Sequence, residues 1–188
     1  NALNDTYSSK QWDLDSIDAL AAWEFPALKN ATATVGVDVV DNGFGNTHED
    51  LVDNVRSTYN ATTKLENVPV SCPPGTPNTN HGSHVAGIVA AASNNQKGVS
   101  GVGFNHLKLS LVSITRTSRP ASMSSDDIAT GFEYLIAHKD QYNIRVVNMS
   151  IGGKVGSLPN PKDDVILKKI DEAYDKGIVT VASGGNQT

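Results

Sequence analysis

The sequence holds one cysteine and few aromatic residues, and it lacks long apolar runs and blocks of basic residues. Cys72 has no second cysteine to pair with, so no disulfide within the chain is expected, and the redox compartment stays open. The longest clean apolar stretch runs from Val85 to Ala92, far short of the roughly 20 residues that a membrane helix needs. Because the net charge is −5, we expect neither a membrane nor nucleic acid as a partner.

The remaining composition is typical of a globular protein. Of the 188 residues, 38% are hydrophobic and 19% are charged, which suffices for one buried core in a single domain. The chain begins with Asn1 rather than Met, and no signal or transit segment is visible. We therefore expect a processed product or an excised part of a longer chain.

Short β-branched runs alternate with stretches of helical spacing. The expected strands are 35–40, 107–114, 144–149 and 178–182, and the expected helices are 13–23, 81–92, 124–136 and 163–176. Pro26 is expected to stop the first helix, Ser124 to cap the third, and Gly177 to end the fourth. Residues 57–80, rich in Asn, Thr and Pro, are interpreted as a long surface excursion. The alternation predicts a three-layer α/β fold, with helices on both faces of a mostly parallel sheet.

The stretch that begins at His81 indicates a buried helix with a titratable group at its start. Gly82 and Gly87 keep side-chain bulk away, so another backbone or a substrate can approach. A histidine at the edge of a packed core is positioned to act as a general base.

Polar residues end several of the expected strands, where function gathers in parallel sheets. Asp41 ends the first strand, Ser150 follows the third, and Asn186 follows the last. A carboxylate such as Asp41 can accept the Nδ1–H of a histidine and fix its tautomer. The carboxamide of Asn186 can donate to the oxyanion of a tetrahedral intermediate.

Four motifs in a fixed order resemble the subtilisin family of serine endopeptidases, in particular its thermitase-like branch. They are Val39-Val40-Asp41-Asn42-Gly43, His81-Gly82-Ser83-His84-Val85-Ala86-Gly87, Val147-Asn148-Met149-Ser150-Ile151-Gly152-Gly153 and Val181-Ala182-Ser183-Gly184-Gly185-Asn186. The resemblance spans nearly the whole chain. It implies a subtilisin-like peptidase domain, of which residues 1–188 are the N-terminal part, in a secreted protein.

The resemblance also implies roles for these residues. Asp41 would orient the base, His81 would be the general acid–base, and Asn186 would donate to the oxyanion. The segment Ser150, Ile151, Gly152 and Gly153 would bind a protein or peptide substrate in extended conformation. The opposite wall of the cleft would fall near 117–120, where Pro120 lacks an N–H for such pairing.

A structural calcium ion is a further implication of the resemblance. The ligands would be the side chains of Asp5, Asp50 and Asn95 and the carbonyls of Ala92, Lys97 and Val99. All are hard oxygen donors, as Ca²⁺ requires. Independently of the resemblance, two distant carboxylates that converge on a carbonyl-rich loop need a cation. The alternative is a hydrogen-bonded Asn-Gly turn without metal.

Two departures from the family pattern matter. The nucleophile motif, which follows the oxyanion Asn in the family, is not in the sequence, so the Ser is expected beyond residue 188 on a complementary C-terminal segment. The chain alone is expected to be inactive. Asp38 puts a carboxylate inside an apolar strand, where it must find a partner or stay protonated.

Other functions remain open from the residues. A metal-dependent hydrolase would use His81 and His84 on one helix face, with Asp41, His48 or Asp50 as further ligands. A non-catalytic subtilase-like binding module would keep the cleft without a Ser. A nucleotide-binding fold is the weakest alternative, because the glycine spacing after Asp41 is not G-x-G-x-x-G. Five Asn-x-Thr/Ser sequons occur, and since two fall inside expected core motifs, we interpret the set mainly as coincidence.

Overall fold

A six-stranded sheet forms the centre of the molecule in the computed structural model, which describes residues 3–72, 80–115, 123–152 and 164–185. The strand order is β3-β2-β4-β1-β5-β6. All neighbours pair in parallel except β2 and β3, which are antiparallel. The strands are β1 Val35–Asp41, β2 Val55–Asn60, β3 Leu65–Glu66, β4 Leu107–Ser113, β5 Ile144–Met149 and β6 Val179–Ala182.

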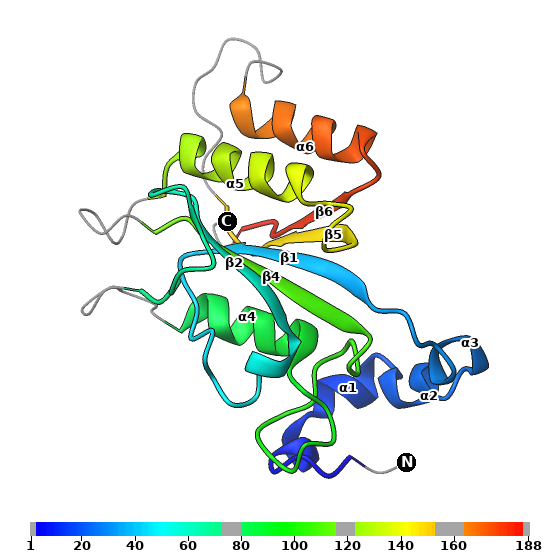
Figure 1. Ribbon diagram of the computed structural model, residues 1–188. Coiled ribbons are helices and arrows are strands. Elements are labelled where there is room, and N and C mark those ends of the chain that lie inside the picture. Colours follow the sequence, from blue (N-terminus) through cyan, green and yellow to red (C-terminus); the bar gives the residue numbers. More distant parts are fainter. Residues whose placement is uncertain (1–2, 73–79, 116–122, 153–163, 186–188) are drawn as a thin grey trace.

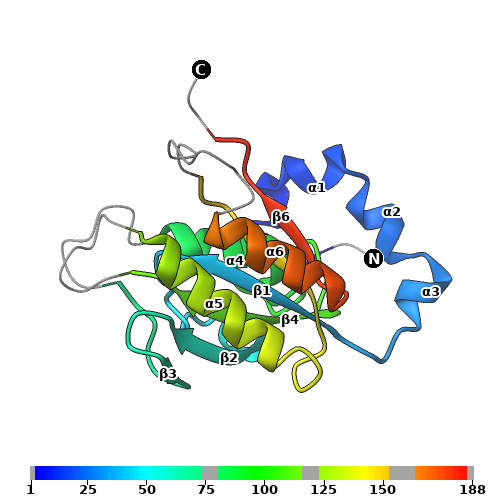
Figure 2. The same cartoon turned by 90° about the horizontal axis from the view of Figure 1, so that it is seen from above.

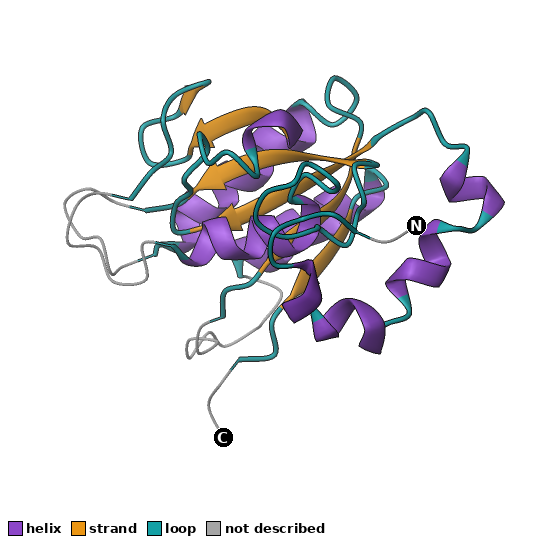
Figure 3. Cartoon of the chain, turned by 90° about the horizontal axis from the view of Figure 1, so that it is seen from below, coloured by secondary structure: helices purple, strands orange, loops and turns teal. Residues whose placement is uncertain are grey.

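Helices cover both faces of this sheet (Figure 1). Helices α5 (Ser125–Ala137) and α6 (Val165–Asp175) lie on one face, and α4 (His81–Ala90) lies on the other. The short N-terminal helices gather at one side of the molecule, apart from α5 and α6 (Figures 2 and 3); they are η1 Ser8–Lys10, α1 Trp12–Ser16, α2 Ala19–Trp23 and α3 Pro26–Lys29. The predicted three-layer α/β fold is thereby confirmed.

Strand β1 separates two apolar cores. Val39 packs with Ala86 of α4 and Leu111 of β4, whereas the next residue, Val40, packs with Phe132 of α5. Successive side chains of a strand point to opposite faces, so one central strand supplies both cores. Each fully buried large side chain contributes roughly 1.5–3 kcal/mol. The strand that ends at Asp41 is therefore held firmly on both sides.

The predicted helix ends are confirmed for α5 and α6. The Ser124 side chain accepts hydrogen bonds from the backbone N–H groups of Asp126 and Asp127. Asp164 caps α6 in the same way, through the N–H groups of Ile166 and Leu167. Gly177 follows α6 with φ of +79°, the left-handed conformation that favours glycine after a helix.

The N-terminal helix prediction was wrong in detail. Asp18 adopts a left-handed conformation with φ of +56°, which divides the expected helix into α1 and α2. Pro26 does not stop a helix but begins the short helix α3, a position where its missing N–H costs nothing.

The expected surface excursion over 57–80 was also wrong in its first part. Residues 57–60 belong to β2, which pairs with β4 inside the sheet. Ser57 and Thr58 are buried, and their hydroxyls bond to Ser110 Oγ and to the Val68 carbonyl. Tyr59 stacks on Tyr134 of α5. Satisfied hydroxyls thus allow a polar sequence to form a buried strand.

Helix α4 is buried along one stripe rather than all round. Gly82, Ala86 and Ala90, four residues apart, face the sheet. Ile88, on the other side, is 50% exposed. No helix in the described ranges is long and apolar enough to cross a membrane.

Candidate active site

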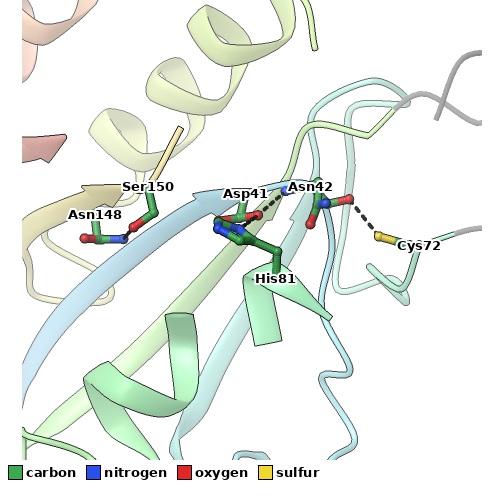
Figure 4. A network of polar contacts seen from close by, with 6 residues as sticks. All are labelled: Asp41, Asn42, Cys72, His81, Asn148 and Ser150. Atoms are coloured by element: carbon green, nitrogen blue, oxygen red, sulfur yellow. Dashed lines mark hydrogen bonds and ion pairs between the residues drawn. The ribbon is translucent and has the colours of Figure 1, made fainter. Parts of the chain in front are cut away.

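Asp41 and His81 form a hydrogen-bonded pair at the carboxyl edge of the sheet (Figure 4). Asp41 is the last residue of β1 and is fully buried. His81 is the first residue of α4, and its Nδ1 lies 2.9 Å from both carboxylate oxygens of Asp41. The Asn42 N–H also donates to Asp41 Oδ1, at 2.7 Å. The backbone at the end of β1 therefore helps to hold the carboxylate in place, independently of its contact with the imidazole.

A close backbone contact sets the distance between the helix and the strand end. A Cβ built on Gly82 would lie 2.4 Å from the Gly43 carbonyl oxygen and 3.0 Å from Asp41 Cβ. Ser83 adds a second link, because its Oγ accepts the Gly45 N–H at 2.7 Å. The start of α4 is thus tied to the turn that follows Asp41.

This geometry defines what the imidazole can do. With Nδ1–H donated to a buried carboxylate, the tautomer leaves Nε2 free to accept a proton. The His81 side chain is 44% exposed, whereas that of Asp41 is 1% exposed. The buried carboxylate would stabilise the imidazolium once it forms. The arrangement is suited to general acid–base chemistry at an accessible edge.

The expected substrate segment follows β5, the strand next to β1. Ser150 is half-buried, and its Oγ accepts a hydrogen bond from Asn148 Nδ2 at 2.9 Å (Figure 4). Ile151 packs against the core, and Gly152 is exposed. Gly153, Asn186 and 117–120 lie outside the described residues, so their predicted roles stay predictions.

Two of the expected calcium ligands, Asp5 and Asp50, bind the loop that follows α4. Asp5 and Asp50 are each 3% exposed. Asp5 accepts the N–H groups of Asn94 and Asn95, both at 3.1 Å. Asp50 accepts Asn95 Nδ2 at 2.8 Å and the Val99 N–H at 2.9 Å.

The same loop also holds the N-terminal arm through its backbone. Thr6 N–H donates to the Lys97 carbonyl, and Tyr7 N–H donates to the Gly98 carbonyl. Ala92 N–H donates to the Asp50 carbonyl. Over the described ranges, neither the Asp5 nor the Asp50 carboxylate forms an ion pair with a Lys, Arg or His side chain, and Lys97 of the same loop pairs with Glu49. Two buried carboxylates without a cationic side chain fit a site for a hard cation.

The metal-dependent alternative finds no support in the geometry. Within the part of the chain that the structure describes, no three His, Cys, Asp or Glu side chains are grouped to hold a metal. All the proposed ligands of that alternative, including His48 and His84, lie in those ranges. His81 directs its Nδ1 to Asp41 instead.

Two residues near the pair were missed by the sequence reasoning. Cys72 Sγ donates to the Asn42 carbonyl at 3.1 Å (Figure 4), so a loop residue supports the turn after Asp41. Burial, together with the charge of Asp41, raises the pKa of the Cys72 thiol above its usual value. Ser83, expected only as part of a motif, supports the same turn through Gly45. Neither contact has a sequence signal, because each joins segments about 30 or more residues apart.

Asp38 finds no partner for its carboxyl group among the described residues, so the second of the two expected outcomes, a protonated acid, is favoured. It is fully buried, and neither carboxyl oxygen has a hydrogen-bond partner. Burial raises the pKa of Asp38 well above its usual value, so the neutral acid is the favoured form. Asp38 lies three residues before Asp41, on the other face of β1, and does not contact His81.

A mostly parallel sheet that holds an Asp–His pair at its carboxyl edge is an arrangement typical of α/β enzymes that use acid–base catalysis. Comparison with known families makes the assignment specific. The chain belongs to the subtilase family of serine peptidases, because that family's model matches residues 32–188.

Individual relatives agree with this assignment. The chain is 29% identical to thermitase of Thermoactinomyces vulgaris over 184 residues, which cover 97% of the chain and 57% of that protein. It is 34% identical to subtilisin E of Bacillus subtilis (strain 168) over 165 residues, 86% of the chain and 38% of that protein. A solved structure of a protease from Pseudoalteromonas arctica PAMC 21717 superposes with a TM-score of 0.75 at 26% identity. That match covers 99% of the chain and 60% of the solved one. The chain therefore spans about 57% and 38% of the length of the two curated relatives.

Proposed function

We propose that the chain is the N-terminal part of a serine endopeptidase domain that uses an Asp–His–Ser triad. The observation that carries the proposal is the contact of His81 Nδ1 with both oxygens of buried Asp41, at 2.9 Å. The serine would come from a segment outside residues 1–188. Ser83 and Ser150 already accept hydrogen bonds from Gly45 and Asn148, which supports leaving them out of that role.

Each residue of the chain has a defined task in this proposal. His81 Nε2 takes the proton of the serine hydroxyl as the oxygen attacks the peptide carbonyl, and later returns it to the leaving amine. Asp41 holds the imidazole ring and stabilises its charged form. Asn186 donates to the oxyanion.

The substrate is an extended protein or peptide segment. The residues that follow β5, from Ser150 to Gly153, would pair with it as an added strand. Support comes from their place: they continue the strand beside β1, and Gly152 is exposed. Asp41 ends β1 and Ser150 follows β5. The scissile bond would therefore lie at the carboxyl edge of the sheet, near the ends of these two strands.

We also propose that Asp5, Asp50, Asn95 and the carbonyls of Ala92, Lys97 and Val99 hold a structural calcium ion. When bound, the ion supplies the positive charge that two buried carboxylates require. The chain's own residues fasten the N-terminal arm to the loop after α4. This proposal is independent of catalysis, because Asp5 and Asp50 do not contact Asp41 or His81.

The remainder of the domain is proposed to cover the exposed apolar surface of the chain. A groove of about 790 Å³ runs along α4, lined by residues that include Trp12, His84 and Ile88. Trp12 is 75% exposed and Ile88 is 50% exposed. At the other end of the sheet, Val179 and Val181 of the edge strand β6 are 53% and 51% exposed. Surfaces of this kind call for a covering segment.

We further propose that the protein is exported, as its family membership favours. Export and peptidase activity are separable. The peptidase proposal is tested with the full-length protein and its His81→Ala, Asp41→Asn and His84→Gln variants on a quenched fluorogenic peptide. His81→Ala is expected to lower kcat/KM by at least about 100-fold, whereas His84→Gln should largely retain activity. Equal loss in both histidine variants would contradict the triad and favour a metal site.

A further inference from the structure

Five Asn-x-Thr/Ser sequons stand in the sequence, at Asn4, Asn30, Asn60, Asn148 and Asn186. Such a sequon can accept an N-linked glycan where it lies on an exposed surface of a secreted protein. Asn186 lies outside the described residues. The structure separates the other four by what surrounds each acceptor amide, and this changes the interpretation of the set as coincidence.

Asn148 is inside the sheet. It belongs to β5, which pairs with β1 on one side and β6 on the other. Its Nδ2, the atom to which a glycan would be joined, donates to Ser150 Oγ at 2.9 Å. Asn148 is also half-buried, so its amide lies against the sheet at the edge of the active site and not on an exposed loop.

Asn4 and Asn60 are engaged in other contacts. Asn4 Oδ1 accepts the Gln96 N–H, and Thr6 Oγ1 donates to the Gln96 carbonyl, so the whole sequon is pinned to the loop after α4. Asn60 Oδ1 accepts both the N–H and the hydroxyl of Thr62. The middle residues of the two sequons, Asp5 and Ala61, are 3% and 2% exposed. Both tripeptides are parts of the packed structure.

Asn30 differs from these three in that no residue of its sequon is buried and none lies in a strand of the sheet. It follows helix α3 as its C-terminal cap, and both Asn30 and Thr32 are exposed in the connection to β1. In the described part of the chain, the Thr32 hydroxyl has no hydrogen-bond partner. The single bond of Asn30 Nδ2 is to the Pro26 carbonyl, at 2.9 Å, and it is exposed.

We propose that Asn30 is an N-glycosylation site and that Asn4, Asn60 and Asn148 are not; the proposal rests on the proposed export. The donor is a lipid-diphosphate-linked oligosaccharide. The bond between the anomeric carbon of the sugar and the diphosphate oxygen breaks, and a bond from that carbon to Asn30 Nδ2 forms. Nδ2 loses one proton, and the lipid diphosphate leaves. The remaining N–H can still donate to the Pro26 carbonyl.

The position keeps a bulky glycan away from the active site. Asn30 precedes the amino end of β1, whereas Asp41 is the last residue of that strand, and a seven-residue strand is about 20 Å long. Helix α3 lies far from the start of α4 (Figures 1 and 2). Near Asn30, Phe25 is 67% exposed and Leu28 is 40% exposed. A glycan there would shield this apolar surface without obstructing the substrate edge.

The test uses the full-length protein directed into the secretory pathway of a eukaryotic host by a signal peptide that the vector supplies. Total protein, secreted or retained, is deglycosylated by an amidase in heavy-oxygen water, which marks each former acceptor as labelled Asp. Peptide mapping then reads the occupancy of each sequon. The variants are Asn30→Gln, Thr32→Ala and Thr32→Ser, with Asn60→Gln as the matched control.

The Asn30 peptide is expected to carry the label in the wild type and in Thr32→Ser, and to lose it in Thr32→Ala. The Asn30→Gln chain should migrate as one glycan smaller, and Asn60→Gln should not change. An unlabelled Asn30 peptide in the wild type, or labelling of Asn4, Asn60 or Asn148, would overturn the proposal. A glycosylated protein without peptidase activity would count against the proposed function alone. A full-length protein that stays inside the cells that naturally make it would count against export alone.

Discussion

Gly82 lies so close to Gly43 that a Cβ at position 82 would stand 2.4 Å from the Gly43 carbonyl oxygen. This contact brings the first turn of α4 against the turn that follows Asp41. The His81 ring can reach the carboxylate only because no side chain separates these two backbones. The distance between His81 and Asp41 therefore depends on these two glycines as well as on the hydrogen bond between the side chains.

Replacing Gly82 with Ala is expected to damage the active site more than the fold. Overpacking of this kind costs typically about 1–3 kcal/mol, and the helix start that carries His81 must shift to relieve it. Peptide hydrolysis by the full-length variant should fall by at least about 10-fold. Gly177→Ala is the control, since Gly177 follows α6 and its φ of +79° also makes an alanine there strained, away from this contact. Equal activity of the two variants would contradict the contact.

The buried acid of β1 predicts an unusual dependence of stability on pH. Because burial raises the pKa of Asp38 above the usual value of 3.8, the folded state holds this proton more tightly than the unfolded state. The free energy of unfolding therefore falls as the pH rises from about 3.8 toward the pKa of the folded state. Below 3.8 the stabilisation of the protonated form is fully present.

Substitution of Asp38 should remove this dependence. Asp38→Val, which also removes the two unpartnered oxygens, is expected to stabilise the full-length protein by about 1–3 kcal/mol at neutral pH. The gain should shrink as the pH is lowered. Asp38→Asn keeps the polar shape without a titrating proton and should flatten the pH profile. Urea unfolding at several pH values measures both effects, and a wild-type stability that rises with pH relative to Asp38→Asn would refute the sign.

Removal of calcium is expected to lower the stability of the protein. At a calcium concentration 100 times the Kd, binding contributes about 2.7 kcal/mol, and a chelator removes that contribution. Asp5→Asn and Asp50→Asn should reduce the response of Tm to calcium. Glu49→Gln is the matched control, because Glu49 is an exposed neighbour of Asp50 that forms an ion pair with Lys97. A Tm that is the same with and without chelator would contradict the calcium site.

Much of the architecture was predictable because it rests on strong local signals. The apolar run before Asp41 and the glycines after it predict a buried strand and its end. The small residues after His81 predict the helix. Ser124, followed by two acidic residues, predicts the start of α5, and the structure has that cap. At these places the hydrophobic pattern, the helix cap and the turn residues all predict the same element.

The parts that could not be predicted depend on partners far apart in the sequence. Strand β2 has a polar sequence, and the hydroxyl of its buried Ser57 finds a partner in Ser110 of β4. The break at Asp18, where φ is +56°, has no signal in the helical pattern of the segment. Cys72 supports the Asn42 carbonyl across 30 positions of sequence. Ile88 is 50% exposed because the described part of the chain packs only against the opposite face of α4. The periodicity of α4 does not show which of its faces is covered.

The central claim is that His81 and Asp41 activate a serine for attack on a peptide bond. The most direct measurement is the reaction of the full-length protein with a serine-directed phosphonate, followed by mapping of the labelled peptide. We expect one labelled serine, located after Thr188, with labelling strongly slowed in His81→Ala and unchanged in His84→Gln. A folded full-length protein in which no serine after Thr188 is labelled would contradict the account.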